Sequence, residues 1–130
     1  MTVIQHHTLL TVDPVVQYGA IAALQHQSEV ETLRQLYKER RDYTVQQFSN
    51  VDGISPIHSR GGFYITLNCR QYMAEKGINM SLELAERIMQ SEYVATVPGS
   101  DFGLPHTLRL SFSSNKYKCG IDRLVRFFKC

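Results

Sequence analysis

The chain has 130 residues, a formal charge of +2 and a hydrophobic fraction of 43%, which suits a single small domain with a real apolar interior. Its 14 basic residues are spread among 12 acidic ones, so the sequence has no basic patch for nucleic acid or an anionic membrane. No apolar run approaches the roughly 20 residues that span a bilayer, and the first residues lack the basic and apolar blocks of a secretion signal, so we expect a soluble cytoplasmic protein.

Two helices are predicted first along the chain. Asp13 before Pro14 is an N-cap followed by a first-turn proline, and apolar residues follow it at helical spacing. Ser28 and Glu31 have the spacing of a capping box. We therefore expect a second, longer helix to begin at Ser28 and to extend along an amphipathic stripe as far as Ser49.

Two short strands come next. The residue pattern predicts them near 54–58 and over 63–67, where apolar side chains alternate with polar ones across a turn at Gly61-Gly62. A brief helical piece ends at Gly77, and Ser81 is placed to cap the following helix.

The last part of the chain predicts a strand, a loop, a strand and a helix. A five-residue strand over 93–97 ends at Pro98-Gly99 and leads into a glycine-bearing loop, and the strand over 108–112 turns its three apolar residues to one face and Arg109 to the other. A final helix presents an apolar stripe over 121–128. This order of elements predicts an α+β fold with helices packed on one face of a small mixed sheet.

Arg109 is the main candidate for a binding residue. A guanidinium that points away from the core could hold a carboxylate through two parallel charge-assisted hydrogen bonds. An outward arginine on a half-buried strand is also commonly just solvated. The pattern alone leaves both interpretations open.

Other reactive side chains give no recognisable constellation. The three cysteines lack Cys-x-x-Cys spacing, which favours reduced thiols over a disulfide framework or a zinc site. His6 and His7 would need further ligands to bind a metal. His58 and His106 have no serine or cysteine nucleophile at a known spacing, which argues against a hydrolase.

Four segments of the chain together resemble a known family. The sequence Val-Pro-Gly-Ser-Asp-Phe-Gly over 97–103, followed by Leu-Arg-Leu-Ser-Phe over 108–112, is similar to the C-terminal part of the class I/II, fold type I, pyridoxal-phosphate-dependent aminotransferases of the aspartate aminotransferase type. Three further segments match that family in the same order: Asp13-Pro-Val-Val-Gln17 with Ala20 to Leu24, Tyr37 with Arg40-Arg41-Asp42, and Gly61-Gly62-Phe63-Tyr64.

The resemblance implies a division of the chain and a role for some residues. Residues 1–27 would be the end of the large cofactor-binding domain with its connecting helix, and 28–130 the small C-terminal domain. Arg109 would bind the substrate carboxylate. Phe63 would form an apolar wall near the cofactor, and Ser100 would lie at the entrance to the substrate cleft.

The same resemblance shows what the chain does not contain. The family's Schiff-base lysine lies upstream of every matching segment, so we expect no catalytic and no cofactor-binding residue here, and no transaminase activity from this chain alone. In the complete enzyme, pyridoxal 5'-phosphate, an amino acid and a 2-oxo acid would be bound. The resemblance also implies a homo-oligomer, a dimer in this family, with Thr11 near a subunit boundary, and it puts Phe102 at the cleft entrance beside Ser100.

Two alternatives stay open. The family includes lyases and synthases as well as transaminases, and the substrate side chain is read mainly by parts outside this chain. The chain could also be a non-catalytic structural or binding module, from a truncated or degenerate gene, with the same fold.

Overall fold

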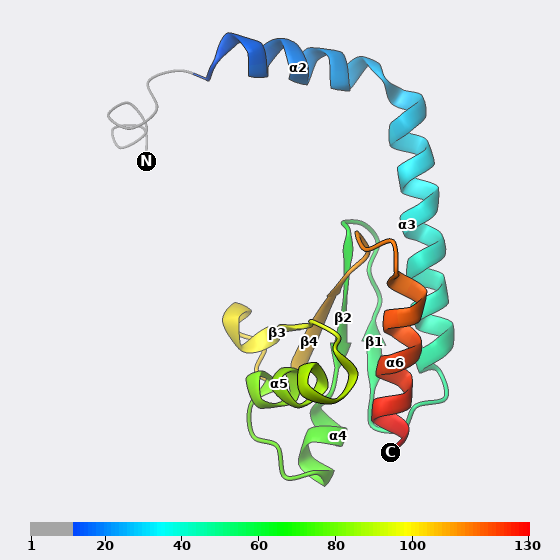
Figure 1. The fold of residues 1–130 in the computed structure, drawn as a ribbon, viewed down its shortest axis with the longest axis vertical. Coiled ribbons are helices and arrows are strands. Elements are labelled where there is room, and N and C mark those ends of the chain that lie inside the picture. The colour runs from blue at the N-terminus through cyan, green and yellow to red at the C-terminus, as the bar shows by residue number, and fades with distance from the viewer. Residues whose placement is uncertain (1–11) are drawn as a thin grey trace. The chain divides into compact units, whose positions relative to one another are not determined.

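The structure, a computed structural model, describes residues 12–130 of the chain (Figure 1). The chain separates into two compact units, Met1–Gln35 and Leu36–Cys130. The division falls within helix α3 (Gln27–Phe48). Each unit is described by itself, and the domain boundary predicted between residues 27 and 28 stays a prediction.

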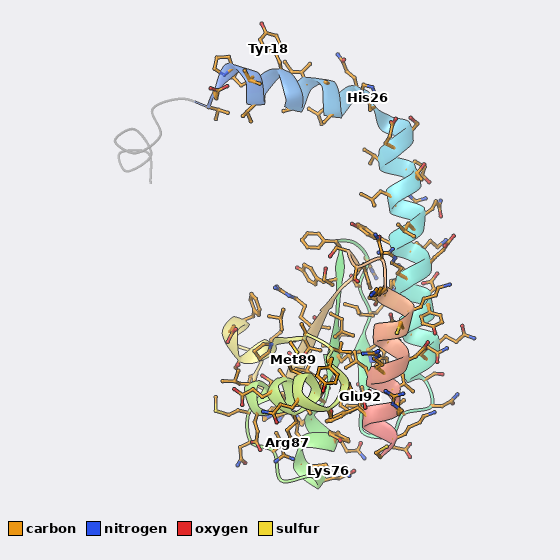
Figure 2. All side chains as sticks on the ribbon, in the orientation of Figure 1. Tyr18, His26, Lys76, Arg87, Met89 and Glu92 are labelled. Carbon is orange, nitrogen blue, oxygen red and sulfur yellow. The ribbon has the colours of Figure 1, made fainter. Side chains whose placement is uncertain are left out.

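The described part of the first unit is helical and exposed. Helix α2 (Pro14–Gln25) begins as predicted, because the Asp13 side chain accepts a hydrogen bond of 2.8 Å from the Val15 amide and Pro14 occupies the first turn. No residue of α2 is buried. Its apolar side chains stand out from the helix, and Tyr18 is 74% exposed (Figure 2).

Helix α3 begins differently from the prediction. It already includes Gln27, so Ser28 lies within its first turn, where its hydroxyl donates to the Glu29 carboxylate. Glu31 accepts instead from Arg34 and, second, from Gln35, and these hydrogen bonds lower the pKa of Glu31 to about 2. The predicted capping box is therefore wrong.

The second unit contains a four-stranded sheet in the order β1-β2-β4-β3. The strands are β1 (Ser55–Ile57), β2 (Tyr64–Asn68), β3 (Val97–Pro98) and β4 (Thr107–Ser111). All three pairings are antiparallel, so the expected mixed sheet is wrong in this respect, while the α+β class is confirmed. Short connections join β1 to β2 and β3 to β4, and such connections favour antiparallel neighbours.

Strand β3 is shorter than predicted. A five-residue strand was expected over 93–97, but the chain pairs with β4 only at Val97 and Pro98. Tyr93 takes a left-handed conformation, with φ of 55°, at the end of helix α5 (Ser81–Glu92). The chain therefore leaves α5 through a sharp bend before it can extend beside β4.

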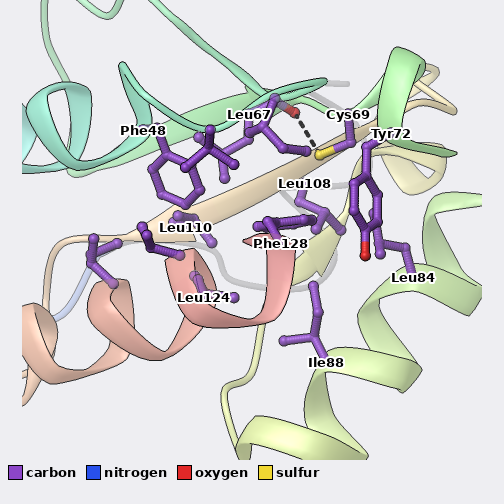
Figure 3. Close-up of a cluster of buried hydrophobic side chains, with 14 of the residues drawn as sticks. Phe48, Leu67, Cys69, Tyr72, Leu84, Ile88, Leu108, Leu110, Leu124 and Phe128 are labelled. Carbon is purple, nitrogen blue, oxygen red and sulfur yellow. Dashed lines mark hydrogen bonds between the residues drawn. The ribbon is translucent and has the colours of Figure 1, made fainter. Parts of the chain in front are cut away.

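The core lies on one face of this sheet. Alternate residues of β2 and β4, among them Leu67, Leu108 and Leu110, are almost completely buried (Figure 3). They pack against α5, the end of α3, α4 (Arg70–Glu75) and α6 (Tyr117–Lys129). The helices thus cover one face, as the residue pattern predicted.

A thiol and two rings close one end of this core. Cys69 is fully buried, and its Sγ donates to the Leu67 carbonyl oxygen at 3.7 Å. The rings of Tyr72 and Phe128 meet edge to face at 4.9 Å. Burial raises the pKa of the Cys69 thiol to about 12, so this cysteine is a packing residue and not a nucleophile.

The other face of the sheet carries the side chains that alternate with the core residues. Tyr64 and Thr66 of β2 and Arg109 of β4 belong to this face, which we call the open face. Within the described part of the chain, no helix is both long and apolar enough to cross a bilayer.

Candidate functional site

Arg109 lies at the centre of the open face. It is paired in register with Thr66 of β2 on one side and with Val97 of β3 on the other. Its neighbours in sequence, Leu108 and Leu110, are buried in the core on the opposite face. The alternation of the strand therefore directs the arginine away from the core, as predicted.

Two aromatic rings contact the guanidinium of Arg109. Its Cζ atom lies 4.2 Å from the centroid of the Phe102 ring and 5.0 Å from that of the Tyr64 ring. A planar guanidinium stacks well on aromatic faces, both by dispersion and by attraction to the ring quadrupole. Phe63 extends this aromatic group, since its ring meets the Tyr64 ring edge to face at 5.5 Å.

The guanidinium of Arg109 has no acidic partner among residues 12–130. The four ion pairs in this part of the chain are formed by four different arginines, Arg34, Arg41, Arg87 and Arg126. Stacking uses the face of a guanidinium and leaves the N–H groups on its edge free to donate. Arg109 is therefore available for an anion, and a carboxylate matches its paired donors in geometry.

Phe102 is brought to Arg109 by a tightly fixed loop. The loop contains the 3₁₀ helix η1 (Gly99–Phe102) and runs from Pro98 to His106; we call it the η1 loop. The Ser100 amide donates to the Ser81 Oγ at 3.1 Å, and the Ser81 amide donates to the Pro105 carbonyl at 3.2 Å. Ser81, fully buried at the start of α5, thus holds both sides of the loop.

Close packing at Gly99 fixes the start of the same loop. A Cβ atom added there would lie 2.0 Å from Thr107 Oγ1 and 2.4 Å from the Leu104 carbonyl oxygen. Gly103 closes η1 with a positive φ of 73°, a conformation that glycine adopts without strain. The two glycines of this segment are therefore required by the path of the loop.

The structure brings together some of the predicted site residues. Phe102 contacts Arg109 directly, and Phe63 reaches it only through the Tyr64 ring. Phe63 was expected to share a strand face with Ile65 and Leu67, but it precedes β2 and is 56% exposed, whereas those two residues are buried. The Ser100 amide fastens the η1 loop and its hydroxyl donates to Asp101, so its place at the cleft entrance stays a prediction.

Tyr64 was missed as a site residue. The register places Tyr64 of β2 opposite Ser111 of β4. Tyr64 is therefore the diagonal neighbour of Arg109 across the strand pair. The sequence shows that Tyr64 and Arg109 both point away from the core residues, but only the pairing register shows that they are neighbours. The predicted boundary residue Thr11 lies outside the described residues.

None of the five lysines lies on a strand of the open face. Lys76 lies over the Tyr72 ring and Lys118 over the Tyr43 ring. The Ser100 amide, which could have faced a phosphate, donates to Ser81.

No metal site is found in the described part of the chain, where no group of three histidine, cysteine or acidic side chains converges. His6 and His7 lie outside the described residues.

Comparison with known proteins agrees with the resemblance in the sequence. A family model described as aminotransferase class I and II matches residues 2–128. The aspartate aminotransferase of Geobacillus stearothermophilus is 30% identical over 132 residues, which cover 99% of this chain and 34% of that protein. The probable aspartate/prephenate aminotransferase of Aquifex aeolicus is 35% identical over 115 residues, or 85% of this chain and 29% of that protein.

Solved structures show the same fold. The aspartate aminotransferase of Thermotoga maritima matches with a TM-score of 0.80 at 29% identity, over 98% of this chain and 32% of that one. An aromatic aminotransferase from Pyrococcus horikoshii matches with a TM-score of 0.82 at 26% identity, over 97% and 34% of the two chains. This chain spans about a third of the length of these relatives. It belongs to the aminotransferase class I and II family.

Proposed function

We propose that this chain is the small C-terminal domain of a pyridoxal-phosphate-dependent aminotransferase, with the last helix of the large domain, and that Arg109 binds the substrate carboxylate. Family membership supports the first part. The single observation that carries the second is the guanidinium of Arg109, which stacks on two rings of the open face and has no acidic partner among the described residues.

The work of this chain in the reaction would be binding and orientation. In the complete enzyme the cofactor supplies an electron sink, which stabilises the carbanion at the substrate α-carbon. Arg109 would fix the carboxylate of the amino acid or 2-oxo acid through two parallel hydrogen bonds, so that the reacting carbon is held at one place. Phe63, 56% exposed beside Tyr64, would provide an apolar wall, and Ser100 would lie nearby at the rim.

Binding of a small dicarboxylate to the purified chain tests the role of Arg109. Maleate, titrated by calorimetry, is expected to bind the unmodified chain weakly and saturably, and Arg109→Ala should weaken binding at least tenfold, since a charge-assisted hydrogen bond contributes about 1.5–3 kcal/mol. Arg87→Ala is the matched control, because that arginine is paired with Glu83 on the exposed side of α5. Equal affinity of the Arg109→Ala and unmodified chains would reject the proposed role.

The chain alone should not catalyse transamination. This expectation follows from the position of its five lysines, none of which lies on a strand of the open face with Arg109. The purified chain should be incubated with pyridoxal phosphate, aspartate and 2-oxoglutarate. Formation of glutamate above the rate of the cofactor alone would contradict the expectation.

A non-catalytic module with the same fold is the second candidate. The observation that favours it is that none of the five lysines lies on a strand of the open face. The two candidates differ in the maleate titration, since a purely structural domain would bind no dicarboxylate saturably.

We also expect self-association of the chain and a cytoplasmic location. The apolar residues of α2, such as Val15 and Leu24, are 78% and 73% exposed, and exposed apolar surface of this kind commonly marks an interface. Sedimentation velocity over a range of concentrations tests the association, and a monomer at every concentration would contradict it.

A further inference from the structure

The contact between Phe102 and Arg109 suggests a role that the fold alone does not require. We propose that Phe102, held in place by Ser81 through the η1 loop, is a positioning residue that keeps the Arg109 guanidinium ready to receive a carboxylate. This inference deepens the proposed function and rests on it. It adds two residues, Phe102 and Ser81, to the determinants of the site.

The first step of the argument is that the Phe102 ring is not held by the core. The side chain is 53% exposed, so its burial contributes only part of the stabilisation that a buried phenylalanine gives. The Cζ atom of the Arg109 guanidinium lies 4.2 Å from the centroid of this ring. The ring therefore acts mainly on Arg109.

The second step is that the backbone beneath Phe102 is rigid. Ser81 holds the loop on both sides, and the Leu104 amide donates to the Gly99 carbonyl at 2.9 Å. The hydroxyl of Thr107 donates to the Leu104 carbonyl at 3.0 Å. The position of the ring is thus set by hydrogen bonds to α5 and β4.

The third step is the effect on the arginine. Tyr64, on the neighbouring strand, lies on the guanidinium at 5.0 Å, so the group contacts one ring from the sheet and one from the η1 loop. A free arginine side chain loses much rotamer freedom when it binds a ligand, whereas one already held by two rings loses less. Pre-organisation of this kind strengthens binding without adding any contact to the ligand.

The test uses the complete 130-residue chain and two readouts by NMR. The first is the heteronuclear relaxation of the Arg109 Nε–H group without ligand, which reports the order of the guanidinium. The second is the dissociation constant for maleate. Phe102→Leu should reduce the order of Arg109 and weaken maleate binding about two- to fivefold, the range expected for an exposed cation–π contact.

Three variants make the result specific. Phe102→Tyr keeps a ring and should restore both readouts. Ser81→Ala should also reduce the order of Arg109, because it removes the acceptor for the Ser100 amide. Tyr18→Leu removes an exposed ring of α2 and is the control that should change neither readout.

The outcomes separate this inference from the proposed function. If the unmodified chain binds no maleate, the proposed function fails, and the ligand-free order of Arg109 still decides whether Phe102 holds it. If maleate binds but Phe102→Leu leaves order and affinity unchanged, the positioning role is overturned. If Phe102→Leu has its effect while Ser81→Ala has none, the contribution of Ser81 is overturned.

Discussion

Gly99→Ala should destabilise the second unit more than any other glycine-to-alanine change in the described chain. The added Cβ would lie 2.0 Å from Thr107 Oγ1, 2.4 Å from the Leu104 carbonyl oxygen and 2.9 Å from the Thr107 carbonyl oxygen. Two of these three atoms are backbone: the Leu104 oxygen lies in the η1 loop, which Ser81 holds at both sides, and the Thr107 oxygen lies at the start of β4. The clash can be relieved only by moving the loop.

The magnitude follows from two costs. Overpacking of a close-packed site costs about 1–3 kcal/mol. Movement of Thr107 would also break the hydrogen bond from its hydroxyl to the Leu104 carbonyl, worth about 1 kcal/mol. We expect Gly99→Ala to lower the free energy of unfolding by about 3 kcal/mol and the melting temperature by about 12–24 °C in a unit of this size.

Urea unfolding followed by circular dichroism measures this effect, and two further variants test its cause. Gly120→Ala lies in α6 with no atom within 4 Å of the added Cβ, so it should stabilise by about 0.5–1 kcal/mol. Thr107→Ala combined with Gly99→Ala removes the hydroxyl but leaves the Leu104 carbonyl at 2.4 Å, and should not rescue stability. A loss below 1 kcal/mol for Gly99→Ala would refute the steric reasoning.

Three further changes have definite expected results. Burial raises the pKa of Cys69 from 9.0 to about 12, so the folded state holds the thiol proton more tightly than the unfolded state. The contribution of this proton to the free energy of unfolding, up to about 4 kcal/mol, is complete below pH 9 and is lost between pH 9 and 12. Cys69→Ala should therefore show a flatter dependence of unfolding free energy on pH in urea titrations from pH 8 to 11, and an unchanged slope would count against this. Arg40 donates to the Phe112 carbonyl and lies 5.8 Å from the Tyr117 ring, so Arg40→Met should lower the free energy of unfolding by about 2 kcal/mol. Arg34→Met removes only an exposed ion pair to Glu31 and should cost less than about 1 kcal/mol. Equal losses for the two variants would contradict this distinction. A chain of residues 36–130 should unfold cooperatively, with a melting temperature close to that of the full chain, because every buried residue of the described part lies at Thr44 or beyond. A non-cooperative transition in calorimetry would contradict this.

The sequence predicted the parts of the fold that depend on local pattern. The period-two alternation around Arg109 placed its neighbours in the core and the arginine on the other face, and the structure confirms this. The N-cap at Asp13 is also confirmed. Each of these features involves residues that are close in the chain, where side-chain period and capping chemistry act directly.

The parts that failed depend on tertiary contacts. Ser81 was expected to cap α5, but it is the first residue of the helix and its hydroxyl accepts from the Ser100 amide, nineteen positions away. The capping box at Ser28 gave way to a helix that begins one residue earlier. The approach of Tyr64 to Arg109 needs the pairing register of β2 and β4, which no local pattern contains.

The alternation in β4 also has a consequence for folding. If β4 shifted by one residue relative to the helices, Leu108 and Leu110 would move into solvent and the guanidinium of Arg109 would enter the apolar interior, where no acid of the core could neutralise it. A sheet with this shifted register would thus lose stability twice, through exposed leucines on one face and a buried charge on the other. Arg109, the residue proposed to bind the substrate carboxylate, therefore also favours the correct register of β4, the strand that carries it.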